Sequence, residues 1–295
     1  MKPTLIMLCG LPGSGKSKAA EEYSYCFPVM IHSSDALRKE MFGDENCQDK
    51  NNELFNELHS RIKKDLLDGR DVIYDACNIH SKFRMAFLNS IRKIDCCKEA
   101  WIIATPYEIC LRNNWMRERK IPDAVIDRMY RNWQTPWYFE GWDSIKAFNN
   151  YKGYYDLLTK TKWTRFNQYN QNNPYHTKTL GDHLFAAEEY IKNYSDDDNL
   201  ARAALMHDFG KPYCRFEDKV GISHYYDHEN VGAYDALSIY CQPVEVSALI
   251  NYHMHPIHWE NVKDYDKVCD KWRKIWGTDF FDKIMLLHEA DEASR

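Results

Sequence analysis

A glycine-rich segment near the amino terminus constrains the fold more than any other feature of this sequence. Residues 10–17 read GLPGSGKS and match G-x-x-x-x-G-K-[ST] at every fixed position. The apolar run TLIMLC precedes the segment and a helical pattern follows it. In this context backbone N–H groups wrap phosphate oxygens, the lysine reaches the β- and γ-phosphates, and the serine binds Mg²⁺. We therefore predict an ATP and Mg²⁺ site at Gly13, Ser14, Gly15, Lys16 and Ser17.

The first half of the chain alternates short apolar runs with amphipathic stretches. The apolar runs at 4–9, 29–32, 71–74 and 101–104 are typical of buried strands. A helical pattern covers 81–93, and Ser81 is a plausible N-cap. Continuous apolar strands that alternate with helices indicate a parallel sheet covered on both faces, so we predict an α/β domain over residues 1–150.

The second half has a different pattern. From Thr179 onward the sequence is helical in character, with Pro243 expected in a first turn and Thr278 as a cap. An aromatic and Asn/Gln-rich stretch, 148–175, separates the two patterns. We predict an all-α second domain over residues 151–295.

Composition excludes some classes of protein. The formal net charge is −5, so contact with nucleic acid would need a local basic patch. The cysteines form no C-x-x-C pair, which argues against a thiolate zinc site or a secreted disulfide framework. No apolar stretch is long enough to span a bilayer. These features favour a soluble cytoplasmic protein without membrane contact.

Polar residues follow the predicted second and third strands, where parallel α/β sheets bind ligands. Asp35 could accept a proton from an attacking hydroxyl, and Arg38, one turn later, could hold an acceptor phosphate. Asp35 could equally be a helix N-cap. Asp75 and Asn78 follow the third strand; Asp75 is either a metal-side carboxylate or a structural turn residue.

A basic segment follows the fourth predicted strand. CLRNNWMRERKIPDAVIDRMY carries Arg112, Arg117, Arg119, Lys120 and Arg128. Such a run is often a solvated helix face. Its position before Ile-Pro also suits a lid, from which an arginine would stabilise charge on a transferring phosphoryl group.

Ionisable residues in the second half lie on apolar helix faces. His183 shares a face with Ala187, and His253 and Asp291 continue other apolar stripes. The pair His207-Asp208 ends an apolar helical segment just before a glycine. A buried unpaired charge is costly, and a shared metal ion would remove that cost for all of these residues.

The order GLPGSGKS, SSDALR, VIYDACNIHSKFR and RNNWMRERKIPDAVIDRMY resembles the kinase domain of phage and bacterial 5′-hydroxyl polynucleotide kinases. The resemblance covers about 140 residues. It implies that Asp35 is the general base and that Arg38 binds the acceptor phosphate. It also implies a lid arginine on the donor phosphates, for which Arg117 is the best match and Arg112 and Arg119 are close rivals.

The string LMHDFGKP…HYYDHENVGA resembles the HD phosphohydrolase superfamily. It is similar to the HD domain of bacterial tRNA nucleotidyltransferases and to bacterial enzymes that join HD and polynucleotide kinase modules. The resemblance implies that His183, His207, Asp208 and Asp291 hold one metal. It also implies that His228 and His253 hold a second metal or the scissile phosphate. Nitrogen and oxygen ligands suit Mn, Ni, Co or Fe(II).

Further histidines that could line this site are His176, His224, His255, His258 and His288.

Together these features predict an enzyme that heals RNA or DNA ends. The kinase would phosphorylate a 5′-OH with an NTP, and the HD domain would remove a 2′,3′-cyclic phosphate or a terminal 2′- or 3′-phosphate. One alternative is a nucleoside or metabolite kinase fused to an HD nucleotidase. Another is a nucleotide sensor with a degenerate HD fold, against which the complete motifs argue.

Overall fold

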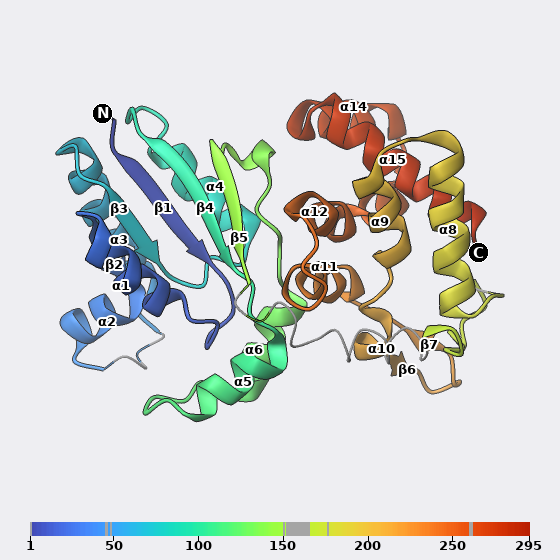
Figure 1. The fold of residues 1–295 in the computed structure, drawn as a ribbon, viewed down its shortest axis with the longest axis horizontal. Coiled ribbons are helices and arrows are strands. Elements are labelled where there is room, and N and C mark those ends of the chain that lie inside the picture. Colours follow the sequence, from blue (N-terminus) through green and yellow to red (C-terminus); the bar gives the residue numbers. More distant parts are fainter. Residues whose placement is uncertain are drawn as a thin grey trace. The chain divides into compact units, whose positions relative to one another are not determined.

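The computed structural model describes residues 2–44, 47, 49–149, 151, 166–175, 177–259 and 262–295 (Figure 1). His176, one of the further histidines that could line the metal site, lies outside the described residues. The chain divides into two compact units. The first comprises Met1–Ile126 and Pro136–Phe148, and the second comprises Asp127–Thr135 and Asn149–Arg295.

The first unit is built on a five-stranded parallel sheet with strand order β2-β3-β1-β4-β5. The central strand β1 is buried along almost its whole length, while edge strand β2 is partly exposed. The strands are β1 (Thr4–Cys9), β2 (Met30–Ser33), β3 (Val72–Asp75), β4 (Cys97–Ile103) and β5 (Ser144–Phe148). Because β1 and β3 are neighbours, the glycine-rich loop after β1 lies beside the end of β3.

Helices connect the strands of this unit (Figure 1). They are α1 (Lys16–Cys26), α2 (Ser34–Phe42), α3 (Asn51–Leu67), α4 (Ser81–Ser90), α5 (Tyr107–Trp115) and α6 (Asp123–Arg131), with a short 3₁₀ turn η1 (Tyr138–Glu140). The predicted α/β class with a parallel sheet is confirmed. Strand β5 was not predicted, because SIKAF is partly exposed at the sheet edge and lacks a continuous apolar run.

Three predicted helix starts need small corrections. Ser81 is the first residue of α4 and not its cap, because the extended residue before it is His80. In the same way, Thr278 begins a helix whose N-cap is Gly277, at φ +81°. Pro243 is an N-cap and not a first-turn residue. Each prediction placed the boundary one residue too late or too early, a normal error for capping signals read without dihedral angles.

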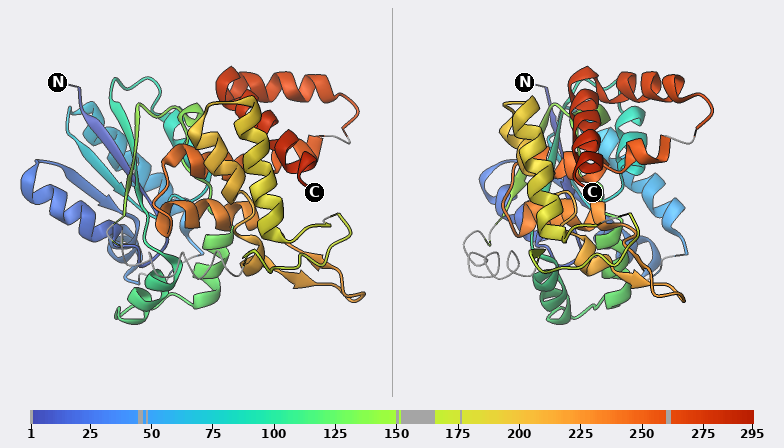
Figure 2. Two further views of the ribbon diagram at one scale, coloured as in Figure 1. Left: turned by 45° about the vertical axis from the view of Figure 1, so that its right-hand side comes forward. Right: turned by 90° about the vertical axis from the view of Figure 1, so that its right-hand side faces the viewer.

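The second unit is mainly helical, as predicted (Figures 1 and 2). Its helices are α8 (Leu180–Tyr194), α9 (Asp198–Met206), α10 (Lys211–Cys214), α11 (His228–Ser238), α12 (Val244–Tyr252), α13 (His255–Trp259), α14 (Tyr265–Trp276) and α15 (Thr278–Ala293). Helices α8, α9 and α15 pack against one another, as do α11 and α12. A two-stranded antiparallel pair, β6 (Phe216–Glu217) and β7 (Ser223–His224), was not predicted because strands this short leave no periodic pattern.

Helix α6 belongs to both units, since its first residues fall in the first unit and Asp127 onward fall in the second. Within the part that falls in the second unit, Asp127–Thr135, Tyr130 and Trp133 are buried, and Trp133 has no exposed surface. Apolar burial of this kind attaches residues 127–135 to the helical unit. No helix within the described part of the chain has the length and apolar character needed to cross a membrane.

Candidate active sites

The glycine-rich loop is held from the side by helix α5. Gly13 adopts φ +80°, and a Cβ atom there would lie 2.3 Å from the carbonyl oxygen of Cys110. The amide of Asn113 donates to the Gly13 carbonyl over 2.9 Å, and the Thr105 hydroxyl donates to the Ser14 carbonyl over 2.8 Å. Only glycine fits Gly13, because both the dihedral angle and the approach of α5 exclude a side chain.

The charged groups of the loop are arranged for a triphosphate and a divalent ion. The Lys16 ammonium lies over the loop and donates to the carbonyls of Gly10 and Leu11 over 3.0 and 2.8 Å. The Ser17 hydroxyl donates to Asp75 Oδ2 over 2.7 Å. A serine at the start of α1 and an aspartate at the end of β3 therefore form the oxygen pair that P-loop proteins place at Mg²⁺.

Asp35 and Arg38 lie on the first turns of α2. The N-cap of this helix is Ser33, whose hydroxyl accepts from Ala36 N, so Asp35 does not serve as the cap. Arg38 NH1 donates to Asp35 Oδ1 over 3.2 Å. The Arg38 side chain is buried, and its Nε has no hydrogen-bond partner. An orphaned guanidinium N–H beside a partly exposed carboxylate suits an anionic acceptor.

The basic segment after α5 reaches Asp35. Arg119 NH1 lies 2.9 Å from Asp35 Oδ1, whereas Arg117 and Arg112 are exposed. Asn114 is buried and closes the loop between α5 and α6, because its side chain exchanges hydrogen bonds with the backbone of Ile121 at 2.7 and 3.0 Å. This clamp holds the loop that carries Arg119 in a defined conformation.

A buried ion pair supports the end of β3. Arg84 and Glu140 are both fully buried and lie 2.6 Å apart. Arg84 also donates to the carbonyl of Asn78, whose amide donates to Leu8 O at the end of β1. Asn78 itself adopts φ 47°. No sequence pattern indicated Arg84 or Glu140, because their pairing depends on the contact between α4 and η1.

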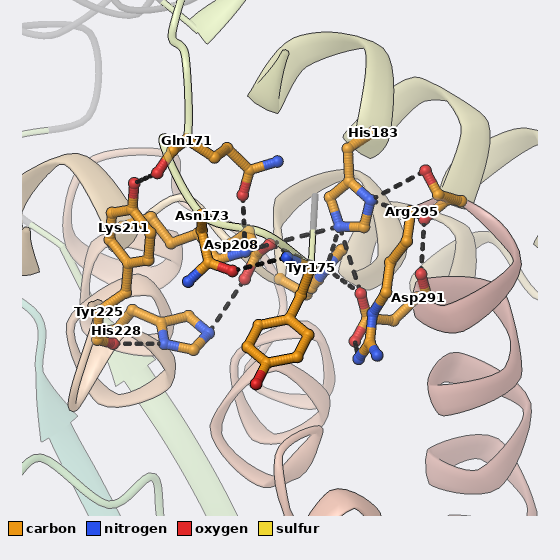
Figure 3. Close-up of polar contacts among 12 residues, drawn as sticks. Gln171, Asn173, Tyr175, His183, Asp208, Lys211, Tyr225, His228, Asp291 and Arg295 are labelled. Atoms are coloured by element: carbon orange, nitrogen blue, oxygen red, sulfur yellow. Dashed lines mark hydrogen bonds and ion pairs between the residues drawn. The ribbon is translucent and has the colours of Figure 1, made fainter. Parts of the chain in front are cut away.

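A histidine–aspartate cluster occupies the interior of the helical unit (Figure 3). His183 of α8, His207 and Asp208 after α9, and Asp291 of α15 are all buried. His183 Nε2 lies 3.1 Å from His207 Nε2, and 3.3 Å from both Asp208 Oδ2 and Asp291 Oδ1. Residues from three separate helical regions therefore direct nitrogen and oxygen atoms to one point.

Asp208 also belongs to a second group. Its Oδ1 lies 3.0 Å from His228 Nε2 at the start of α11 and 4.0 Å from His253 Nε2 after α12. The ligand atoms of Asp208, His228 and His253 lie within 4.8 Å of one another, as do those of His183, His207 and Asp208. Asp208 is thus shared between two sets of ligand atoms, with His228 on the opposite side from His183 (Figure 3).

The ring orientation of the histidines is set by backbone carbonyls. In three of them Nδ1 lies 2.7 Å from the carbonyl oxygen three residues earlier, so that Nδ1 carries the proton and Nε2 faces the cluster. These pairs are His207 with Ala204, His228 with Tyr225, and His253 with Ile250. His183 Nδ1 instead contacts the Ser294 hydroxyl at 2.8 Å. Such contacts are the usual support of metal-binding imidazoles.

Unpartnered atoms test whether the cluster fits a metal ion. His228 Nε2 and His253 Nε2 are buried without hydrogen-bond partners, and they face Asp208 Oδ1 at 3.0 and 4.0 Å. Burying such atoms is costly, and a divalent cation would satisfy them together. The ligand atoms are imidazole nitrogens and carboxylate oxygens without thiolates, a set that suits Mn, Ni, Co or Fe(II). The residues present therefore fit a divalent metal.

The pKa values in the cluster follow from burial and from the opposed charges. Burial would lower the pKa of His207, but the carboxylates of Asp208 and Asp291 outweigh it and raise this pKa to about 10. Burial and the neighbouring His207 lower the pKa of His253 to about 3. Burial would raise the pKa of Asp208, yet Lys211 and His207 hold it well below its usual range. The cluster is thus a site where a cation, proton or metal, is strongly favoured.

The structure adds residues that sequence reasoning missed. Lys211 Nζ lies 2.5 Å from Asp208 Oδ2 and donates to Gln171 Oε1 over 2.8 Å. Gln171 comes from the Asn/Gln-rich stretch and is buried beside the cluster (Figure 3). Arg295 pairs with Asp291 at 3.1 Å. The lysine in HDFGK could have been found from its spacing to Asp208, whereas Gln171 carried no signal beyond its place just before the helical region.

Three of the further histidines, His224, His255 and His258, differ in their surroundings from the cluster. His224 pairs with Asp218 at 3.0 Å in the β6–β7 hairpin. His255 packs among Tyr252, Trp272 and Trp276, and burial lowers its pKa to about 4. His258 is exposed.

Comparison with protein families finds two domains in the chain. The AAA domain family matches residues 5–136, and the HD domain family matches residues 176–293. The residues of the nucleotide site fall in the first match, and the histidine–aspartate cluster falls in the second.

Two curated relatives each match about half of the chain. The chain is similar to the L-seryl-tRNA(Sec) kinase of Methanococcus maripaludis, with 30% identity over 150 residues that cover 47% of this chain and 56% of the relative. It is also similar to the protein kti12 of Schizosaccharomyces pombe, with 25% identity over 48% of this chain and 54% of the relative. The chain thus spans about half the length of the curated relatives it matches.

A solved structure of the Pnkp1/Rnl/Hen1 RNA repair complex aligns with a TM-score of 0.41 and 18% identity, over 44% of this chain and 43% of the other. A gluconokinase from Sinorhizobium meliloti aligns with a TM-score of 0.35 and 17% identity, over 50% and 82% of the two chains.

Proposed function

We propose that this chain, which joins a P-loop kinase domain to an HD domain, heals nucleic-acid ends by phosphorylating a 5′-hydroxyl and removing a 2′,3′-cyclic or terminal 2′- or 3′-phosphate. The observation that supports it most is the presence of two complete sets of catalytic groups in one chain. One is the Ser17–Asp75 pair with Asp35 and Arg38 nearby, and the other is the buried cluster around Asp208.

In the kinase reaction the acceptor hydroxyl attacks the γ-phosphorus, ADP leaves, and Asp35 takes the hydroxyl proton. Arg38 would hold the phosphate next to the acceptor, since its Nε is buried without a partner. We assign the lid contact with the donor phosphates to Arg119, because it lies at Asp35 while Arg117 is exposed. Phosphate oxygens would draw Arg119 away from Asp35 and free that carboxylate to act as a base.

In the hydrolase reaction His183, His207, Asp208 and Asp291 would hold a divalent metal, and His228 and His253 would hold a second ion or the scissile phosphate. The metal would supply Lewis-acid activation of water and neutralise phosphate charge. The chain's own residues orient the ligands, through the carbonyl contacts of the histidines. Lys211 balances the charge of Asp208.

The experiment uses an RNA that carries a labelled 5′-OH end and a 2′,3′-cyclic phosphate end, with ATP, Mg²⁺ and each of Mn²⁺, Ni²⁺ and Co²⁺. We expect a 5′-phosphate and a free 2′,3′-diol. Lys16→Ala should remove only the first product and Asp208→Ala only the second. If neither end changes under any metal, end healing is wrong.

A second acceptor class is favoured by the 30% identity to a kinase of L-seryl-tRNA(Sec). The same Asp35 could deprotonate a hydroxyl on an aminoacyl group carried by a tRNA. A parallel assay should therefore compare a 5′-OH oligonucleotide, a seryl-tRNA and a free nucleoside at equal concentration. Preference for the nucleoside would favour a metabolite kinase fused to a nucleotidase instead.

A further inference from the structure

The helical unit includes a short segment that is separated in the sequence from the rest of that unit by Pro136–Phe148. Residues 127–135 lie within the stretch matched by the AAA domain family, yet they pack inside the helical unit. They continue directly from the basic loop that carries Arg119. Their contacts reach α10, α11 and α12, the elements next to Lys211, His228 and His253.

The contacts with α10 and α11 are polar and aromatic. Tyr213 of α10 donates to Asp127 Oδ1 over 2.5 Å, and the Arg131 guanidinium lies 5.0 Å from the Tyr213 ring centroid. The Tyr130 hydroxyl donates to Asp235 Oδ1 of α11 over 2.6 Å, and the Tyr130 ring packs edge-on against Tyr213. The segment therefore holds α10 and α11 at fixed positions relative to one another.

Asn251, near the end of α12, is the centre of the polar contacts. Its Oδ1 accepts from Thr135 N over 3.0 Å, and its Nδ2 donates to Trp133 O over 3.1 Å and to Asn230 Oδ1 over 2.8 Å. Asn230 in turn donates to Arg131 O over 2.8 Å. The Asn251 amide is buried and both of its polar atoms are satisfied, so removing it would leave buried backbone groups without partners.

The two asparagines flank the second set of metal ligands. Asn230 follows His228 by two residues at the start of α11, and Asn251 precedes His253 by two residues at the end of α12. The imidazole centroids of His228 and His253 lie 5.3 Å apart. The Asn230–Asn251 hydrogen bond thus ties together the two helix ends that carry these imidazoles.

We propose that Asn251 and Asn230, joined to residues 127–135 of the kinase segment, are positioning residues that hold His228 and His253 at the separation needed to bind a metal or phosphate. The hydrolase site would then depend on a piece of the kinase domain that takes no part in its chemistry. This inference rests on the proposed function of the HD cluster.

The test uses the full chain with Asn230→Ala and Asn251→Ala, because both remove the bond between the helix ends. Mn²⁺ binding is measured by calorimetry without substrate, and hydrolysis of the RNA 2′,3′-cyclic phosphate is measured against Mn²⁺ concentration. We expect Mn²⁺ affinity at the weaker site, or the Mn²⁺ dependence of hydrolysis, to worsen about 10- to 100-fold, as for other residues that orient metal ligands. Kinase activity should be unchanged, and excess Mn²⁺ should restore hydrolysis.

Asn132→Ala is the matched control, since Asn132 is exposed on the same segment and its side chain donates to the nearby Arg128 carbonyl. It should behave as the unmutated protein. Asn251→Asp keeps the acceptor for Thr135 N but loses both donated bonds, so it should resemble Asn251→Ala. If Asn251→Ala does not fold, the Mn²⁺ measurements on Asn230→Ala test the proposal by themselves, because Asn230 is only half-buried.

Unchanged Mn²⁺ affinity and unchanged Mn²⁺ dependence in folded Asn230→Ala would overturn the positioning role, even if its melting temperature fell. Failure of the proposed function would look different. The unmutated protein would then bind Mn²⁺ but leave the RNA ends intact, while the calorimetric difference between Asn230→Ala and Asn132→Ala would still report on positioning.

Discussion

The nucleotide site and the HD site differ in how their charged groups are brought together and in how far these groups are exposed to solvent. The first is assembled from one continuous loop and from residues just beyond two strand ends, and Ser17 and Asp35 stay partly open to solvent. The second draws His183, Asp208 and Asp291 from separate helices into a buried cluster. In the open site, water can solvate the charged groups before a substrate binds. In the buried site, water is excluded, so a bound cation would lower the free-energy cost of burying the polar groups.

The two sites should respond differently to mutation. In P-loops the backbone N–H groups supply most of the phosphate contacts, so in this site the few side chains with unique roles should dominate the effects of mutation. In the HD site Asp208 belongs to both ligand sets, and its loss should affect the whole cluster.

The largest expected effect is therefore the loss of each activity through one residue. Asp208→Ala should abolish hydrolysis and remove bound metal, because it takes away the carboxylate shared by both ligand sets. Lys16→Ala should abolish phosphorylation, because the β- and γ-phosphates lose their cation. Elemental analysis after metal loading and assays of both activities check this pair. If either variant lost both activities while its circular dichroism stayed native, the sites would not be chemically independent.

The next effect concerns the proton acceptor. Asp35→Ala should lower the phosphorylation rate by about 10²–10⁴, the usual contribution of a general base. ATP binding should persist, because the P-loop contacts do not involve Asp35. Rapid-quench measurement of the chemical step, beside an ATP titration, separates the two. Near-normal turnover would mean that Asp35 serves only to pair with Arg38 and Arg119.

A paired comparison in the lid distinguishes the arginines. Arg119→Ala should lower the phosphorylation kcat by about 10²–10³, as expected for a donor aimed at the transferring phosphoryl group. Arg117→Ala should have a smaller effect, since Arg117 is exposed and Arg119 lies 2.9 Å from Asp35. A larger loss of kcat in Arg117→Ala than in Arg119→Ala would assign the contact with the donor phosphates to Arg117, the better match by sequence.

The smallest change between two neighbouring conditions is the change in metal affinity from one pH unit to the next. The raised pKa of His207, about 10, means that a metal must displace a proton from the cluster. Metal affinity should therefore increase up to about tenfold per pH unit as pH rises toward that value. Mn²⁺ titrations between about pH 6 and 9, where the histidine range begins, would measure the slope. A flat profile would show that His207 binds no proton in the metal-free protein.

The stability of the metal-free protein should change with pH in the opposite direction to its metal affinity. In the metal-free protein the raised pKa of His207 contributes stability that is fully present below about pH 6.5, the ordinary histidine value. That contribution is lost as pH rises through about 10. Chelator-treated protein should therefore melt at a lower temperature as pH increases through this window, while metal-loaded protein should resist the change.

Local sequence determined much of this protein. The P-loop and its flanking strand and helix could be predicted because they are contiguous in the chain. Asp75 at the end of β3 could be predicted because the carboxyl ends of parallel strands meet at one edge of the sheet. The burial of His183, His253 and Asp291 could be predicted because they lie on apolar helix faces, where a charged group favours a common partner. The full set of histidines and aspartates followed only from the resemblance to the HD superfamily. The α/β class of the first unit and the helical class of the second followed from hydrophobic periodicity alone.

Tertiary structure alone decided the rest. Arg119 reaches Asp35 because Asn114 closes the loop between α5 and α6, a contact that no spacing rule contains. Gln171 and the Arg84–Glu140 pair acquire their roles only through packing between distant segments. Residues 127–135 read as a continuation of the kinase lid, but they lie in the helical unit because burial of Tyr130 and Trp133 there outweighs their place in the sequence. Side-chain burial depends on which surfaces meet, and the order of residues along a chain does not specify that directly.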